Sequence, residues 1–154
     1  MREKIDFIIP SYRSKELVTM AIKSFEKNKG DFDFRYIVVE NSDDESYREE
    51  IIQLVPGKVI WKQNPEAPTI KEIGTGSVAN AQAIEIGISQ AEAKYVFICH
   101  SDVVACHPEW MSFLFSKLEE GYRMIGLSAD PVRIEALHQS GILIETELAK
   151  FAPT

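Results

Sequence analysis

Short apolar runs alternate along the chain with longer segments in which apolar residues recur at helical spacing. Four runs predict strands, at residues 5–10, 34–39, 59–61 and 95–99. Their near-continuous apolar character is typical of parallel strands that are covered on both faces. Two less regular runs predict a fifth and a sixth strand, at residues 123–127 and 141–144.

Apolar residues three and four positions apart predict the helices between these strands, at residues 15–27, 45–54, 77–91 and 108–121, with a last helix beginning near Thr146. Ser14 and Ser77 stand before two of them and are expected as N-caps. Asp43 and Asp44 are expected to cap the acidic second helix. The third helix is expected to bury one apolar stripe, formed by Ala81, Ile84, Ile88 and Ala91.

Strands that alternate with amphipathic helices imply right-handed crossovers and a mostly parallel sheet between two helical layers, which is a three-layer α/β/α fold. No repeat or linker divides the chain, so residues 1–154 are expected to form one domain. Ligands of such sheets bind beyond the carboxyl ends of the strands, near a switch in strand order. The segments expected to share that edge are residues 11–13, 40–42 and 100–102.

The charge and composition of the chain exclude several classes of partner and location. The net charge of −7 argues against nucleic acid as a partner and leaves no polybasic patch for an anionic membrane. The sequence has no apolar stretch near the roughly 18 residues that span a bilayer, and no signal peptide, so no transmembrane segment and a cytoplasmic location are expected. Cys99 and Cys106 are expected as free thiols.

Two common nucleotide signatures are absent. The turn after the first strand, residues 10–13, lacks the glycines of a dinucleotide-binding domain. The glycine-rich residues 74–77 lack the lysine of a P-loop. This second segment is either a flexible loop with a helix cap, or a place where backbone amides at the helix N-terminus face a phosphate or a base.

Three strand-end side chains have the chemistry of a nucleotide site, and each has a plainer alternative. Tyr12 can pack on a base or ribose, or merely cover the end of the sheet. Glu40 can accept hydrogen bonds from a ribose or a base imide, or be a solvated loop acid. Asp102 follows an apolar strand and offers the oxygen ligand that a hard divalent cation prefers, or it is a turn residue.

Two further features allow alternatives. A structural zinc site could use Cys99, His100, Cys106 and His107, but their spacing matches no common zinc pattern. Trp110 could flank an acceptor site, but its place in an amphipathic helix favours a core position.

Four segments resemble one family in the same order along the chain. IIPSY at residues 8–12 resembles the IIPTYN opening of family 2 glycosyltransferases, and IVVENSDDES at residues 37–46 resembles their IVVDDGSTD stretch. GSVANAQAIEIGISQA at residues 76–91 is similar to the family's helix ending in N-x-G-I-x-x-A. YVFICHSD at residues 95–102 resembles the strand that ends in Asp-x-Asp. The resemblance implies a GT-A fold and an inverting glycosyltransferase that takes a UDP-, dTDP- or GDP-linked sugar.

The same resemblance implies the site. Asp102 matches the last residue of Asp-x-Asp, and His100 replaces the first, which implies a divalent cation, Mn²⁺ or Mg²⁺, at these two positions. The implied donor-binding residues are Pro10, Ser11, Tyr12, Arg13, Glu40, Asn41, Ser42, Gly76 and Ser101.

The catalytic base of an inverting transfer is expected beyond the donor half. Asp130 is the acidic candidate in the preceding loop, and the chain stops at Thr154, about where the family's base would follow. Either the chain is a fragment or its base is supplied differently. A saccharide or lipid-linked acceptor in polysaccharide biosynthesis is implied. The alternatives are a nucleotide-sugar-binding module without catalysis and a doubly wound regulatory domain, which would need a strand-end lysine that the chain lacks.

Overall fold

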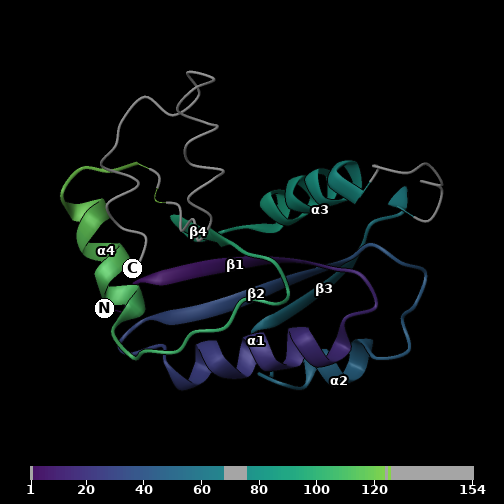
Figure 1. Cartoon of the computed structure of the whole chain (residues 1–154), viewed down its shortest axis with the longest axis horizontal. Coiled ribbons are helices and arrows are strands. Elements are labelled where there is room, and N and C mark those ends of the chain that lie inside the picture. Colours follow the sequence, from purple (N-terminus) through teal and green to yellow (C-terminus); the bar gives the residue numbers. More distant parts are fainter. Residues whose placement is uncertain (1, 68–75, 124, 126–154) are drawn as a thin grey trace, which may run out of the picture. The chain divides into compact units, whose positions relative to one another are not determined.

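The computed structural model describes residues 2–67, 76–123 and 125. The chain divides into two compact units, Met1–Met111 and Ser112–Thr154, and the first unit contains the sheet. Figure 1 labels the elements, which are β1 (Lys4–Ser11), α1 (Lys15–Lys27), β2 (Asp33–Glu40), α2 (Arg48–Ile52), β3 (Val59–Gln63), α3 (Gly76–Gln90), β4 (Tyr95–Ile98) and α4 (Trp110–Glu119). The four expected strands and the four helices between them are confirmed, with shifted ends.

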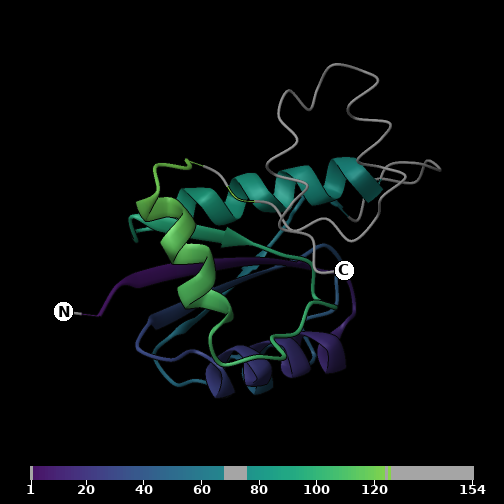
Figure 2. The same ribbon diagram turned by 60° about the vertical axis from the view of Figure 1, so that its left-hand side comes forward.

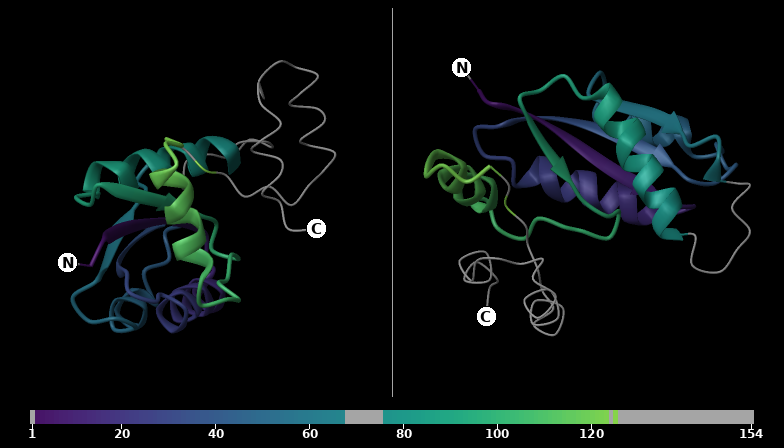
Figure 3. Two further views of the ribbon diagram at one scale, coloured as in Figure 1. Left: turned by 90° about the vertical axis from the view of Figure 1, so that its left-hand side faces the viewer. Right: turned by 90° about the horizontal axis from the view of Figure 1, so that it is seen from above.

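The four strands form one parallel sheet in the order β3-β2-β1-β4. Helices α1 and α2 cover one face and α3 covers the other, so the expected three-layer α/β/α fold is confirmed (Figures 1 and 3). The chain adds β2 and β3 on one side of β1 and then crosses to add β4 on the other side. The strand order therefore switches between β1 and β4, which is where sheets of this kind bind ligands.

The face under α1 is packed with aromatic rings. Phe7 from β1 lies 4.8 Å from Phe25 of α1 and 4.7 Å from Phe34 of β2, measured between ring centroids. Trp110 stacks on Phe25 at 5.5 Å, and its indole N–H donates to the backbone oxygen of Asn28 at 3.1 Å. The expected core position of Trp110 is thus confirmed, and its one polar atom is satisfied.

The face under α3 is built from smaller residues. Ile8, Ile37, Val39 and Ala83 form its buried cluster, with Ile60, Ile86 and Ala91 packed against it. The expected stripe was therefore wrong for two of its four residues, since Ala81 is exposed and Ile88 is 52% exposed, while Ile84 and Ala91 are half-buried. The reason is Gly87, which is buried against Ile8 and lets the small side of α3 face the sheet.

A buried ion pair closes the turn from α3 to β4 at the amino end of the sheet. Arg35 donates to both carboxylate oxygens of Asp6, at 2.8 and 2.6 Å. The backbone amides of Glu92 and Ala93 also donate to Asp6, at 2.6 and 2.9 Å. Burial alone would raise the pKa of Asp6, but these hydrogen bonds together outweigh it and lower the pKa.

The segment after β4 returns along α1 (Figure 2). The backbone amide of Ala105 donates to the Ser24 hydroxyl at 2.9 Å, and the side chain of Asn28 donates to the Ala105 carbonyl at 2.9 Å. These contacts fix the course of the chain directly after the end of β4.

Two of the expected helix caps take different roles. Ser14 is the N-cap residue of α1, but its hydroxyl donates to the carbonyl of Tyr12 at 2.7 Å and makes no cap bond. Helix α3 begins at Gly76, so Ser77 lies inside its first turn instead of before it. In the case of Ser14, the strand-end loop competes with the helix for the serine hydroxyl.

Asp43 and Asp44 do not cap α2, which begins at Arg48 after Tyr47 and is shorter than expected. Asp43 forms an ion pair with Arg13 at 2.7 Å. Asp44 accepts the amide of Ser46 at 2.9 Å in the loop. Local turn bonding has displaced the expected caps.

The sixth strand and the helix near Thr146 fall outside the described residues. Of the expected fifth strand only Arg123 and Ile125 are described, and neither lies in a strand. Among the residues that the structure does describe, no helix has the length and apolar character needed to cross a membrane. One domain over residues 1–154 stays a prediction.

Candidate functional site

A pocket of about 360 Å³ lies at the switch point, beyond the carboxyl ends of β1 and β4. It is lined by Pro10, Ser11, Tyr12, Ser14, Asn41, Gly76, Ser77, Asn80, His100 and Ser101. Most of the predicted site residues thus meet at one edge of the sheet, as the fold class requires. A larger hollow of about 570 Å³ is lined by residues of α1 alone and collects none of the predicted site residues.

Backbone hydrogen bonds that continue past the strand ends hold the pocket walls. The amide of Asn41 donates to the carbonyl of Ser11 at 2.8 Å, which extends the β1–β2 pairing by one residue. The amide of Cys99 donates to the carbonyl of Ile8 at 3.1 Å, which does the same between β1 and β4. The loops therefore leave the sheet from a fixed point.

Tyr12 is 64% exposed, although it is a large aromatic residue at the pocket wall. The guanidinium of Arg13 lies 5.8 Å from the centre of its ring. Tyr12 therefore does not cover the end of the sheet, and its ring is accessible to a flat ligand.

Asn41 has its side chain oriented by a second amide. Its Oδ1 accepts from Nδ2 of Asn64 at 2.8 Å, and Asn64 is 1% exposed. The same Nδ2 lies 3.3 Å from the carbonyl of Ala79 in α3. With its oxygen engaged, Asn41 has its amide N–H groups left as the donors that a ligand in the pocket can meet.

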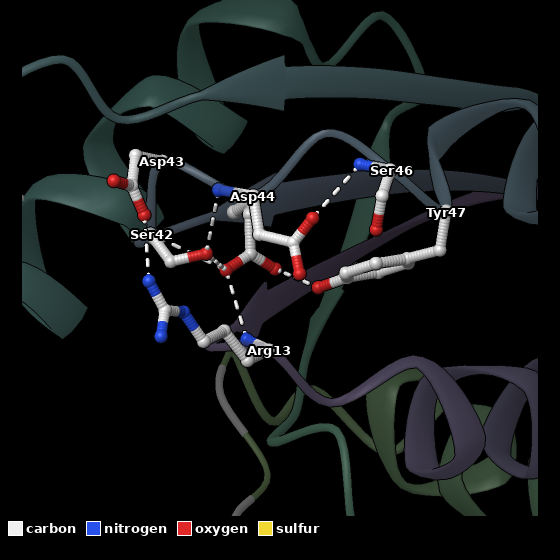
Figure 4. A network of polar contacts seen from close by, with 7 residues as sticks. Arg13, Ser42, Asp43, Asp44, Ser46 and Tyr47 are labelled. Carbon is white, nitrogen blue, oxygen red and sulfur yellow. Dashed lines mark hydrogen bonds and ion pairs between the residues drawn. The ribbon is translucent and has the colours of Figure 1, made fainter.

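Glu40 lies beside the pocket and is not part of its lining. Its side chain is fully buried, and both carboxylate oxygens accept hydrogen bonds from the neighbouring loops (Figure 4). Arg13 and Ser42, also predicted to bind the donor, are two of the residues that donate to it. These three residues are therefore outside the pocket lining, with Glu40 and Ser42 buried and Arg13 exposed.

The first turn of α3 forms another wall. Gly76, Ser77 and Asn80 line the pocket, so the free amides at the helix N-terminus lie beside it. Asn80 was missed by the sequence analysis, and Ser14 and Ser77 were expected only as caps. The available signal for Asn80 was its spacing, because a residue four positions after Gly76 lies on the same side of a helix.

His100 and Ser101 line the pocket from the end of β4, and Asp102 follows as an exposed residue. Burial raises the pKa of the Cys99 thiol to about 12, and the nearby charge of Asp102 adds to this shift. Cys99 is thus an uncharged buried thiol next to the site.

No three His, Cys, Asp or Glu side chains gather as a metal site within residues 2–67 and 76–123. The four residues of the zinc alternative are all in this range, so they do not form that site. Of the two predicted metal-ligating residues, His100 lines the pocket, whereas the exposed Asp102 is not part of its lining.

Asp130, the predicted base, lies outside the described residues. Among the described residues that line the pocket there is no carboxylate.

The fold is a doubly wound α/β domain with a pocket at the switch in its strand order. The family model described as Glycosyl transferase family 2 matches residues 6–142, which is well over half of the chain. The chain therefore belongs to glycosyl transferase family 2. Comparison with curated proteins gives no match.

Three solved structures are similar in fold. Residues 1–349 of S. aureus TarS share 24% identity over 76% of this chain and 32% of theirs, with a TM-score of 0.52. Another S. aureus TarS structure shares 21% identity over 76% of this chain and 20% of its own, with a TM-score of 0.53. Glucosyl-3-phosphoglycerate synthase from Mycobacterium tuberculosis, in complex with UDP, shares 19% identity over 75% and 40%, with a TM-score of 0.49. The chain thus spans a third or less of either TarS structure.

Proposed function

We propose that this chain binds a nucleotide-diphosphate sugar, linked to UDP, dTDP or GDP, and forms the donor site of an inverting, metal-dependent glycosyltransferase. The observation that supports this most is the pocket at the switch between β1 and β4, where Tyr12, Asn41 and His100 meet the first turn of α3. An aromatic ring, an oriented amide and a helix N-terminus together offer stacking, base hydrogen bonding and phosphate binding.

Each wall has a proposed role toward the donor. Tyr12 packs on the base or ribose, and Asn41 donates an N–H to a carbonyl or hydroxyl oxygen of the nucleoside. Ser101 offers a hydroxyl group, Ser11 lines the wall with its own hydroxyl oxygen buried, and the amides of the first turn beginning at Gly76 face phosphate oxygens. Pro10, the next-to-last residue of β1, shapes the wall between them.

Asp102 and His100 would hold a divalent cation, Mn²⁺ or Mg²⁺, together with oxygens of the diphosphate. When bound, the cation neutralises charge on the departing diphosphate. The single carboxylate of Asp102 limits the negative charge that the protein adds beside the phosphates. His100 can instead donate a hydrogen bond to a phosphate oxygen when it is protonated.

An inverting transfer also needs a carboxylate that takes the proton of the attacking acceptor hydroxyl. We propose Asp130 for this role and a saccharide or lipid-linked molecule as the acceptor. The chain spans a third or less of either TarS structure, so we propose both the acceptor class and the transfer activity. The cytoplasmic location expected from the sequence also stays a prediction.

One observation favours a second function, a nucleotide-sugar-binding module without catalysis. The described residues of the pocket lining include no carboxylate that could act as a base. Such a module would bind the donor but would not transfer its sugar, even to water.

Calorimetric titration with UDP, GDP and dTDP, each with and without Mn²⁺, tests the proposal. We expect binding of at least one nucleotide that Mn²⁺ strengthens, and loss of the Mn²⁺ effect in Asp102→Asn. The matched control is Asp31→Asn, an exposed aspartate before β2, which should behave as the wild type. If none of the three nucleotides binds, the donor site does not exist. Binding without hydrolysis or transfer of any sugar nucleotide would favour the module.

A further inference from the structure

A buried carboxylate joins the two loops that carry Tyr12 and Asn41. Glu40 is the last residue of β2 and lies in register with Ser11, the last residue of β1. Its side chain is 0% exposed. A carboxylate is rarely buried unless hydrogen bonds replace its lost water, so its partners show what it is doing.

The partners of Glu40 come from three separate places in the chain. Oε1 accepts the backbone amide of Arg13 at 2.9 Å, from the loop after β1. It also accepts the amide of Ser42 at 3.0 Å and the Ser42 hydroxyl at 2.6 Å, from the loop after β2. Oε2 accepts the hydroxyl of Tyr47, the residue that precedes α2. Figure 4 shows Arg13, Ser42 and Tyr47 around this network, with the side chain of Arg13 turned to Asp43.

The loop after β1 needs such a contact because its backbone is strained. Arg13 has a φ of 49°, a left-handed conformation that costs free energy for any residue except glycine. The bond from its amide to Glu40 and the ion pair from its guanidinium to Asp43, at 2.7 Å, both favour this conformation. The placement of Tyr12, the preceding residue, depends on it.

We infer that Glu40 is a positioning residue, whose carboxylate clamps Arg13 to Ser42 and thereby sets the pocket wall formed by Tyr12 and Asn41. Both wall residues are direct neighbours in sequence of residues that the carboxylate holds. Glu40 does not touch the ligand in this account. The effect on nucleotide binding rests on the proposed function, whereas the clamp itself does not.

The length of the side chain separates this account from direct contact with a ligand. Glu40→Gln keeps the length and one oxygen for Arg13 and Ser42, and the Tyr47 hydroxyl can rotate to accept from the new amide. Glu40→Asp keeps the charge but is one methylene shorter, so it cannot reach all its partners. A clamp therefore tolerates Gln better than Asp, while a charge that meets the ligand would tolerate Asp better than Gln.

The experiment measures two quantities in each variant: hydrogen exchange at the amides of Arg13 and Ser42, and the affinity for the nucleotide that the wild type binds. We expect Glu40→Asp to speed exchange at both amides and to weaken binding about tenfold or more, equivalent to about 1.4 kcal/mol. Glu40→Gln should lie close to the wild type in both. The matched control is Glu49→Asp, an exposed glutamate of α2, which should change neither.

Tyr47→Phe provides a second variant in case Glu40→Asp fails to fold. It removes one donor to the carboxylate and does not alter the pocket lining, so both amides should exchange faster and affinity should fall several-fold. Unchanged exchange in Tyr47→Phe and Glu40→Asp would overturn the clamp, and so would tighter binding in Glu40→Asp than in Glu40→Gln. If the wild type binds no nucleotide, the proposed function fails, and the exchange measurement alone still decides on the clamp.

Discussion

Replacing Gly87 with alanine tests how closely α3 lies on the sheet. A Cβ atom at this position would lie 2.3 Å from Cγ2 of Ile8, 3.1 Å from its Cγ1 and 3.2 Å from its Cβ. Carbon atoms pack best at about 3.5–4.0 Å, so either the helix or the isoleucine must move. Ile8 is 0% exposed in the central strand and has no free space to move into.

Two effects of opposite sign set the magnitude. Alanine is favoured over glycine inside a helix by about 1 kcal/mol. Overpacking a filled core costs about 1–3 kcal/mol, and a separation of 2.3 Å argues for the upper end. We therefore expect Gly87→Ala to lower the free energy of unfolding by about 1–2 kcal/mol in total.

Urea denaturation, with the wild-type m-value retained, measures this change, and a double-mutant cycle locates its cause. Ile8→Ala alone should cost about 2–5 kcal/mol because it opens a cavity. In that background Gly87→Ala should become neutral or stabilising, because the two nearest atoms, Cγ2 and Cγ1 of Ile8, are gone and only its Cβ remains at 3.2 Å. An equal loss in both backgrounds, or a gain in the wild type, would show that the close contact with Ile8 does not hold α3 in place.

Substitutions at three further positions test the ion pair and the pocket. Asp6→Asn should cost about 3 kcal/mol near neutral pH, since it removes the buried charge partner of Arg35 and leaves it only the exposed Glu92. Because the folded-state pKa of Asp6 lies below its unfolded value, this difference should be complete above about pH 4 and vanish as the pH falls further; equal differences at pH 6 and pH 3 would contradict it. Gly76→Leu should block the pocket and abolish nucleotide binding. Gly76→Ala, whose Cβ meets no atom within 4 Å, should bind the nucleotide with an affinity within a few-fold of the wild type. Equal affinities of the two variants in calorimetry would show that Gly76 does not form a wall of the binding site. Asn64→Ala should lower stability by about 1–3 kcal/mol and weaken binding several-fold by freeing the amide of Asn41, and titration giving wild-type affinity would refute that role.

Hydrophobic patterning predicts the layers of this fold well because burial on both faces of a parallel sheet leaves a strong local signal. The runs that begin at Ile5 and Phe34 are strands for this reason, whereas the run that begins at Tyr95 is a strand with Val96 and Ile98 exposed. The buried face of α3 could not be predicted. Gly87 has no side chain that marks it as buried, and it is needed there because it lies against Ile8, which is far away in sequence. The resemblance to the family included the glycine but not its packing.

The sequence predicted where the candidate site lies, but not which side chains line it. The strand-end rule places Ser11, Asn41 and His100 at one edge because the topology alone determines that edge. It does not tell a residue that faces the ligand from one that turns back into the protein. Glu40 and Asn41 are neighbours on opposite faces of a strand end, and only coordinates show that one is buried and the other lines the pocket.

Mapping a bound nucleotide onto backbone amides tests the central claim most directly. We would titrate the isotopically labelled chain with UDP in the presence of Mg²⁺, and with GDP and dTDP if UDP does not bind, and follow each amide by NMR. The account predicts that the largest shifts occur at Ser11, Tyr12, Asn41, Gly76 and Ser101. Shifts confined to the opposite end of the sheet, around Asp6 and Arg35, or no shifts with any of the three nucleotides, would contradict it.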